Sequence, residues 1–306
     1  MRLATIDIGT NSTRLLISEI RDGEVIPLFK TGKVTRLGQG LRESKVLSKE
    51  SIDRTVEVLK EFKEIISKYN VDKITAVATE ATRLAENSEE FLNKVRELGI
   101  DIKILSDREE AELVFLANVY HFNPSGYAMT VDLGGGSTEI VYGTKERIEL
   151  LKSLKFGVVF LYEEFLHSNP PAEEELLKLE EFVSENLLEV KVGIRDLNFE
   201  TFAVGGTITS VVAMEEKMEV YRPEVVHGYR VSKEVIDKWY KKLSSMTLEE
   251  RKNVVGLEEN RADVIIPGLA FFKVFCDVFE KEYLTVSELG LLYSLALKEA
   301  KNWKRE

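Results

Sequence analysis

The chain has 306 residues, enough for two domains, and its 44% hydrophobic and 31% charged residues are typical of a globular protein. Acidic residues outnumber basic ones by 53 to 42, and the formal net charge of −11 argues against a DNA partner. No apolar run approaches the roughly 20 residues that span a bilayer, and the chain opens directly on a strand, so we expect neither a membrane partner nor a signal peptide. The single cysteine, Cys276, lies in an apolar run, which predicts a buried core residue and a cytoplasmic location.

Strands and helices alternate through the first part of the chain, as in α/β proteins. The turn Asp22-Gly23 favours a hairpin between two of the strands. Hydrophobic spacing predicts strands at residues 2–7, 13–20, 24–29, 73–78 and 100–105, and helices at 50–69, 91–98 and 106–122.

Asn123-Pro124-Ser125-Gly126 then interrupts the pattern and predicts a boundary between two lobes, 1–123 and 124–306. Helices are expected to dominate residues 233–282, and the last helix, from 289 to about 303, is expected to pack back on the first lobe. The other elements predicted in this part are strands at 127–131, from 138 to about 154, 201–204 and 283–287, and helices at 157–165 and 172–190.

Two loops share one pattern. Asp7-x-Gly9-x-x-Ser12-Thr13 and Asp132-x-Gly134-x-x-Ser137-Thr138 have the same spacing, and each follows one apolar strand and precedes another. The duplication predicts two similar lobes that present their loops to a shared cleft. Turn stabilisation by an aspartate side chain is the alternative explanation for either loop taken alone.

The second loop contains three consecutive glycines, Gly134 to Gly136. Glycine permits φ > 0 and lets a bulky anion approach bare backbone N–H groups, while the hydroxyls of Ser137 and Thr138 can add donors. Carboxylates on both flanks, Asp132 and Glu139, indicate a phosphate together with the metal that neutralises it. A tight hairpin turn explains the glycines alone equally well.

A capping pattern distinguishes two neighbouring glutamates. Ser106-x-x-Glu109 is a capping box, in which Glu109 folds back on the start of its own helix. Glu110 is then left to project into the cleft, where partial desolvation would suit its carboxylate to base catalysis. The alternative is that Glu110 is only a favourable acid in a first helical turn.

These motifs resemble those of the exopolyphosphatase/guanosine pentaphosphate phosphatase (Ppx/GppA) family, within the actin/hexokinase/Hsp70 superfamily. The resemblance implies an α/β fold of two ribonuclease H-like (actin-like ATPase) lobes, each a mixed sheet with helices, flanking a cleft. It also implies metal-assisted hydrolysis of a terminal phosphoanhydride in polyphosphate or pppGpp. The segments that carry it, in family order, are residues 6–12, 76–83, 109–111, 131–139, 205–207 and 261–265.

The resemblance assigns roles to individual residues. Glu110 would activate the attacking water, with Glu139 as a second catalytic carboxylate. Asp7, Asp132 and Glu139 would form the site for Mg²⁺ or another divalent cation, some of them through water. The implied phosphate-binding residues are Gly9, Thr10, Asn11, Ser12, Arg83, Gly134, Gly135, Gly136, Ser137, Thr138, Gly205, Gly206 and Thr207. A helix cap is the alternative role for Arg83.

Other interpretations stay open at this point. An ATP-dependent kinase of the same superfamily and a non-catalytic regulator that binds an alarmone or nucleotide are the alternative functions, and a homodimer is compatible with either. His121, His167 and His227 lack metal-like spacing, which argues against zinc. Gly290 to Ser294 replaces the Gly-Leu-Arg-Glu-Gly of many family members, so any contact of that arginine and glutamate is in doubt. We also expect this chain to lack the extra C-terminal domain of longer members.

Overall fold

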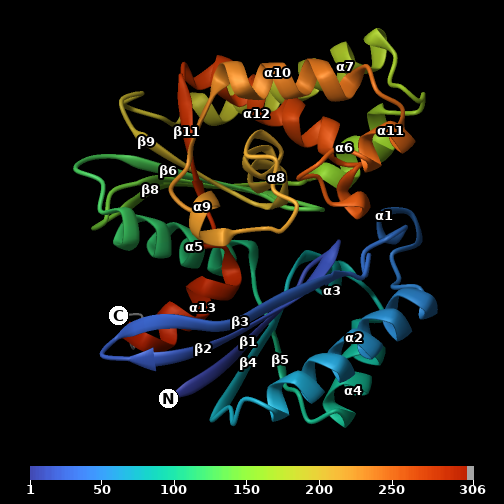
Figure 1. Ribbon diagram of the computed structural model, residues 1–306, viewed down its shortest axis with the longest axis vertical. Helices are drawn as coiled ribbons and strands as arrows, with labels where there is room; N and C mark the ends of the chain where they lie inside the picture. Colours follow the sequence, from blue (N-terminus) through green and yellow to red (C-terminus); the bar gives the residue numbers. More distant parts are fainter. Residues whose placement is uncertain (302–306) are drawn as a thin grey trace. The chain divides into compact units, whose positions relative to one another are not determined.

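The computed structural model describes residues 1–301, and the chain divides into two compact units (Figure 1). Among the described residues, the first contains residues 1–117 and 289–301, and the second contains residues 118–288. Each unit is a mixed β-sheet with helices packed on it, so the predicted fold of two α/β lobes is confirmed. The predicted boundary at 123/124 lies slightly beyond this division.

The sheet of the first unit has the order β3-β2-β1-β4-β5 among the described residues. Alternate residues of its strands point to opposite faces. Ile6 and Ile8 pack with helices α2 and α4 on one face, and Leu3 packs with α13 on the other. The elements are β1 Arg2–Ile8, β2 Ser12–Arg21, β3 Glu24–Val34, α1 Leu41–Ser44, α2 Lys49–Ser67, β4 Lys73–Ala78, α3 Glu80–Leu84, α4 Ser88–Glu97, β5 Ile102–Ile104, α5 Asp107–Phe122 and α13 Leu291–Lys301. The part of the last predicted helix beyond 301 lies outside the described residues.

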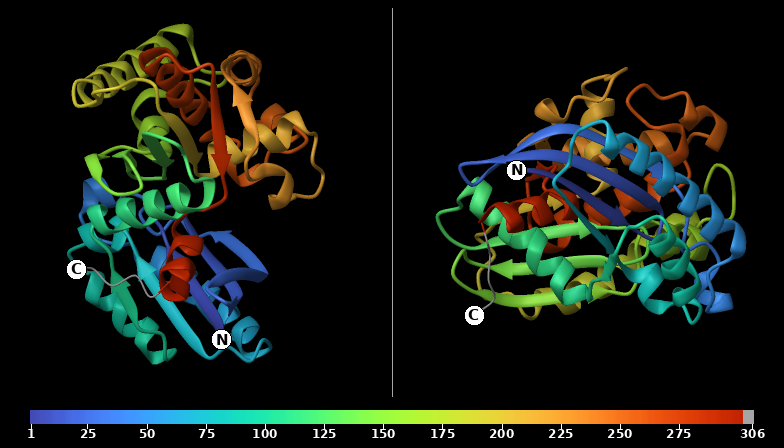
Figure 2. Two further views of the ribbon diagram at one scale, coloured as in Figure 1. Left: turned by 90° about the vertical axis from the view of Figure 1, so that its left-hand side faces the viewer. Right: turned by 90° about the horizontal axis from the view of Figure 1, so that it is seen from below.

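The sheet of the second unit has the order β10-β11-β9-β6-β7-β8, and Figure 2 shows β11 beside β10. Its core includes the whole inner face of α12, and Cys276 there is buried as predicted. The elements are β6 Ala128–Leu133, β7 Thr138–Gly143, β8 Ile148–Leu154, α6 Val158–Phe165, α7 Glu173–Lys191, β9 Glu200–Val204, α8 Gly206–Glu215, α9 Pro223–Val226, β10 Arg230–Ser232, α10 Lys233–Ser244, α11 Leu248–Lys252, the 3₁₀ helix Glu259–Arg261, α12 Ile265–Phe279 and β11 Tyr283–Ser287.

The two sheets repeat one topology. In each unit the strand before the glycine turn (β1 or β6) pairs antiparallel with the next strand and parallel with a later one, β4 or β9. The register is also the same, since Asp7 lies opposite Arg14 and Asp132 lies opposite Glu139. The duplication expected from the sequence pattern is therefore present in the backbone. Within residues 1–301, no helix has the length and apolar character required to cross a membrane.

Candidate phosphate-binding and catalytic site

The two glycine turns have the same internal geometry. The Gly9 amide donates to the Ser12 carbonyl at 3.0 Å, and the Gly134 amide donates to the Ser137 carbonyl at 3.0 Å. A Cβ added at Gly9 would lie 3.2 Å from the Ser12 oxygen, and one at Gly134 would lie 2.9 Å from the Ser137 oxygen. A side chain at Gly134 would therefore force the turn to shift, and one at Gly9 would make a tight contact with the Ser12 carbonyl.

The carbonyls of the second turn are held by helix α6. The amides of Val158 and Val159 donate to the carbonyls of Gly134 (3.0 Å) and Gly135 (2.9 Å). A trans peptide directs its N–H opposite to its C=O, so the amides of Gly135 and Gly136 point away from α6. A Cβ at Gly157 would collide with the backbone of Gly134 and Gly135, which explains the glycine before α6.

In the first turn a different segment holds two carbonyls, which lie one position later in the repeat. The Thr10 carbonyl accepts from the Gly38 amide at 3.0 Å, and the Asn11 carbonyl accepts from the amides of Thr35 (3.0 Å) and Arg36 (2.8 Å). The amides of Asn11 and Ser12 therefore point away from this segment. Each turn thus directs consecutive N–H groups to one side, an arrangement suited to an anion.

The threonine that follows each turn has a structural role. Thr13 and Thr138 are fully buried. The Thr138 hydroxyl donates to the Phe156 carbonyl at 2.7 Å, and the Thr13 hydroxyl pairs with that of Thr35 at 2.9 Å. The hydroxyls of both threonines are therefore bonded inside the fold, and a phosphate contact of Thr138 stays a prediction that would use its backbone amide.

Two carboxylates lie side by side behind the second turn. Asp132 and Glu139 are directly opposite on paired strands, so their side chains share one face of the sheet. Glu139 is 4% exposed and accepts a hydrogen bond from the Ser153 hydroxyl at 3.0 Å. Two negative carboxylates directly opposite each other repel, and a bound cation would remove this repulsion, so the pair is suited to a cation. Nearby, a Cβ at Gly205 would lie 3.5 Å from the Asp132 carboxylate.

Asp7 occupies the corresponding position in the first unit. Burial raises the pKa of Asp7 from 3.8 to about 6, and the positive charge of Arg14 opposes this rise. A bound cation would favour the ionised form of this carboxylate.

Arg14 was missed by the sequence comparison, which stopped at the Ser-Thr pair of each motif. Extended by one residue, the repeat aligns Arg14 with Glu139, since each lies opposite the aspartate of its unit. The stem of Arg14 lies over Gly32, where a Cβ would be 3.2 Å from its Cγ. Its guanidinium makes no hydrogen bond or ion pair with the described residues, so a cation is available beside the first turn.

The start of α5 separates Glu109 from Glu110 as predicted. Glu109 accepts from the Ser106 amide and hydroxyl, both at 3.0 Å, and from Lys103 at 2.8 Å. These bonds, with Lys103 contributing most, lower the pKa of Glu109 to about 2. Glu110, the next residue, is partly exposed and donates its amide to the Ser106 carbonyl at 3.0 Å.

Arg83 lies at the end of α3, close to the same helix start. Its guanidinium donates to the Leu105 carbonyl at 2.6 Å and forms an ion pair with Asp107. The beginning of α3 is near the first turn, where the Thr10 hydroxyl and the Glu80 carboxylate are 3.5 Å apart. Arg83 therefore fixes the start of α5, and its side chain remains 22% exposed.

A third glycine loop lies at the N-terminus of α8. Gly205 has a φ of 106°, and the Arg261 guanidinium lies against Gly206 so closely that a Cβ there would collide with it. Arg261 is held by Glu258 at 2.9 Å. The Thr207 side chain packs against Gly268 of α12, so only the Thr207 backbone faces the helix start. A helix N-terminus with an arginine beside it is suited to an anionic group.

The described residues contain no cluster of three or more His, Cys, Asp or Glu side chains that forms a ready metal cage. His121 and His227 do meet, with their Nε2 atoms 2.8 Å apart, but no third ligand joins them. Mg²⁺ commonly takes only one or two carboxylates and fills its shell with water and phosphate oxygens, so the Asp132–Glu139 pair fits this metal.

The sequence and the structure of the chain match those of known proteins. A family model described as the Ppx/GppA phosphatase family matches residues 16–301. The chain belongs to this family. It is 31% identical to exopolyphosphatase 2 of Mycobacterium tuberculosis, over 98% of both chains. The crystal structure of the Aquifex aeolicus member of the Ppx/GppA family covers 100% of this chain and 99% of its own, with 36% identity and a TM-score of 0.85.

A second relative is about twice as long as this chain. The chain is 36% identical, over 98% of its length, to the bifunctional 3-dehydroquinate synthase/phosphatase of Fusobacterium nucleatum, and it spans 46% of that protein. The resemblance drawn from the motifs is therefore confirmed at the level of family and fold.

Proposed function

We propose that this chain is a phosphoanhydride hydrolase that releases terminal phosphate from inorganic polyphosphate, from pppGpp, or from both. The observation that carries the proposal is the duplicated glycine turn. In each copy, amides of a neighbouring segment donate to the turn carbonyls, so consecutive amides of the turn point to the opposite side, where they can bind an anion. The Mycobacterium tuberculosis relative is named as an exopolyphosphatase, which supports polyphosphate as the first substrate to test.

Phosphate oxygens would be bound by three sets of backbone amides. These belong to the turn at Gly9–Ser12, the turn at Gly134–Ser137 and the start of α8 at Gly205–Thr207. Arg14 and Arg261 would add positive charge, since phosphoryl transfer depends on positioning and charge neutralisation more than on covalent chemistry. Arg83 would act mainly by fixing α5, with its exposed edge available to substrate.

Asp132 and Glu139 would hold the metal, and Asp7 would be the corresponding carboxylate of the first unit. When bound, Mg²⁺ would neutralise charge on the phosphoryl group and help orient it. The Ser153 hydroxyl keeps the Glu139 carboxylate on the face shared with Asp132. Loss of Ser153 is therefore expected to weaken metal binding.

Glu110 would accept the proton of the attacking water. Its neighbour Glu109 is unsuited to that role, because a carboxylate with a pKa of about 2 is a poor proton acceptor at neutral pH. The two residues occupy the same helical turn, and the capping box engages the carboxylate of Glu109.

The test is a phosphate-release assay on long-chain polyphosphate, pppGpp and ATP, with Mg²⁺ and then with EDTA. We expect Mg²⁺-dependent release from polyphosphate or pppGpp and little from ATP. ATP consumption that depends on an added sugar or acid would instead indicate a kinase. Tight pppGpp binding without release of phosphate would indicate a non-catalytic regulator.

A further inference from the structure

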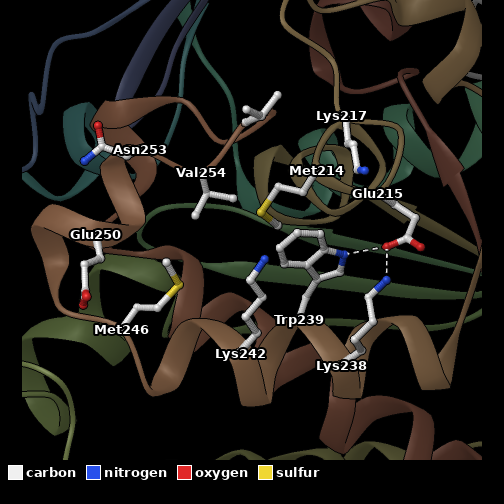
Figure 3. A pocket seen from close by; sticks show the side chains of 11 residues that line it. Met214, Glu215, Lys217, Lys238, Trp239, Lys242, Met246, Glu250, Asn253 and Val254 are labelled. Carbon is white, nitrogen blue, oxygen red and sulfur yellow. Dashed lines mark hydrogen bonds and ion pairs between the residues drawn. The ribbon is translucent and has the colours of Figure 1, made fainter.

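A second cavity lies away from the glycine turns, within residues 118–288 (Figure 3). It has a volume of about 730 Å³ and lies between the end of α8, helix α10 and the loop after α11. This volume falls within the roughly 300–1,000 Å³ of ordinary small-molecule sites. Because α8 spans ten residues from Gly206 to Glu215, the cavity lies roughly 15 Å from the glycine loop at the other end of that helix.

One part of the lining is apolar. Met214, Met246 and Val254 surround the indole of Trp239, as Figure 3 shows. The indole N–H donates to the Glu215 carboxylate at 2.8 Å, which fixes the ring in place. This part of the wall can pack against the apolar or aromatic body of a ligand.

The other part of the lining carries positive charge. The side-chain amines of Lys217 and Lys242 make no hydrogen bond or ion pair with the described residues, although the Lys242 amine lies 4.7 Å from the centroid of the Trp239 ring. The acidic groups of the wall are already engaged. Glu215 pairs with Lys238 and with the indole, and Glu250 accepts the Thr247 amide at 2.8 Å and hydroxyl at 2.9 Å. In a chain of net charge −11, these lysines are a local concentration of positive charge.

We propose that this cavity binds a small organic anion with an aromatic or branched apolar body. Its body would pack on Met246, Val254 and Trp239. Its carboxylate or sulfonate would be attracted by the ammonium groups of Lys217 and Lys242, which lie on different sides of the Trp239 indole. Inorganic polyphosphate does not fit this description, because it has no apolar part to bury. The site is therefore distinct in chemistry, as well as in position, from the proposed phosphate site.

The test uses 8-anilinonaphthalene-1-sulfonate as the probe and Trp239 as the reporter. The sequence has two tryptophans, so Trp303→Phe leaves Trp239 as the only energy donor of that type. In this background, titration with the probe should quench the fluorescence of Trp239 in a saturable way. Excitation of the tryptophan should at the same time produce emission from the bound probe. Lys217→Gln together with Lys242→Gln should weaken binding about tenfold, since two partly exposed ion pairs contribute on that order.

Lys241→Gln is the matched control, because this exposed lysine is on the same helix but does not line the cavity. It should leave the affinity unchanged, and the uncharged analogue N-phenyl-1-naphthylamine should bind more weakly than the sulfonate. Absence of energy transfer from Trp239 would overturn the proposal, as would equal affinity in the double variant and the control. Displacement of the probe by polyphosphate would assign the cavity to the substrate instead.

Discussion

Glu109 and Glu110 are adjacent, and the structure gives them different physical roles. Glu109→Gln keeps the shape of the capping side chain but removes its charge, and with it the ion pair to Lys103. The pKa of Glu109 falls from 4.5 to about 2, which corresponds to an upper limit of roughly 3 kcal/mol at about 1.4 kcal/mol per pH unit. Because the side chain is 23% exposed and glutamine still caps, we expect a loss of about 1 kcal/mol.

The pH dependence of this loss has a definite sign. The folded-state pKa is lowered, so the stabilisation is complete above pH 4.5 and disappears as the pH falls toward 2. Urea unfolding of the wild type and Glu109→Gln should therefore differ at pH 7 and converge as the pH approaches 2. Phosphate release at pH 7 should stay within about twofold of the wild type. A stable Glu109→Gln protein without activity would refute the assignment of roles.

Three further predictions follow from the turns. Gly157→Ala should reduce phosphate release more than about tenfold, because its Cβ collides with the second turn, whereas Gly126→Ala, with open space around it, should not. Asp7→Asn should stabilise the metal-free protein by about 2 kcal/mol at pH 7.5, because an acid with its pKa raised to about 6 destabilises the fold when it is ionised. In urea unfolding this gain in stability should vanish near pH 4. Equal stability of the wild type and the variant at pH 7.5 would contradict the prediction. Arg14→Gln should raise the KM for polyphosphate about tenfold. The exposed Arg21→Gln is its control, and equal KM values would exclude Arg14 from the site.

Regular elements were predictable where the local pattern was strong. The strands Lys73–Ala78 and Tyr283–Ser287 have the bounds expected from their apolar runs. The short helix Glu80–Leu84 was not predicted, because five residues carry too little periodicity. Its position depends on the bonds of Arg83 to residues far along the chain.

The residues of the candidate turns could be predicted from the sequence, but the residues that hold those turns in place could not. The repeat identified both glycine turns, and the Ser106 pattern identified the capping role of Glu109. The groups that hold the turn carbonyls, at Thr35–Gly38 and at the start of α6, are distant in sequence and share no motif. The hydrogen bond from the Thr138 hydroxyl to the Phe156 carbonyl could not be predicted for the same reason, since the two residues are 18 positions apart. Arg14 could have been found by extending the repeat one residue further.

The most direct test of the proposed mechanism is Mg²⁺-dependent phosphate release from polyphosphate by Glu110→Gln, with Glu109→Gln as the matched control. A general base contributes roughly 10²–10⁴-fold to such a reaction. We predict a loss of at least about 100-fold in kcat for Glu110→Gln, with polyphosphate binding and thermal stability retained. Activity within about twofold of the wild type in Glu110→Gln would contradict the mechanism.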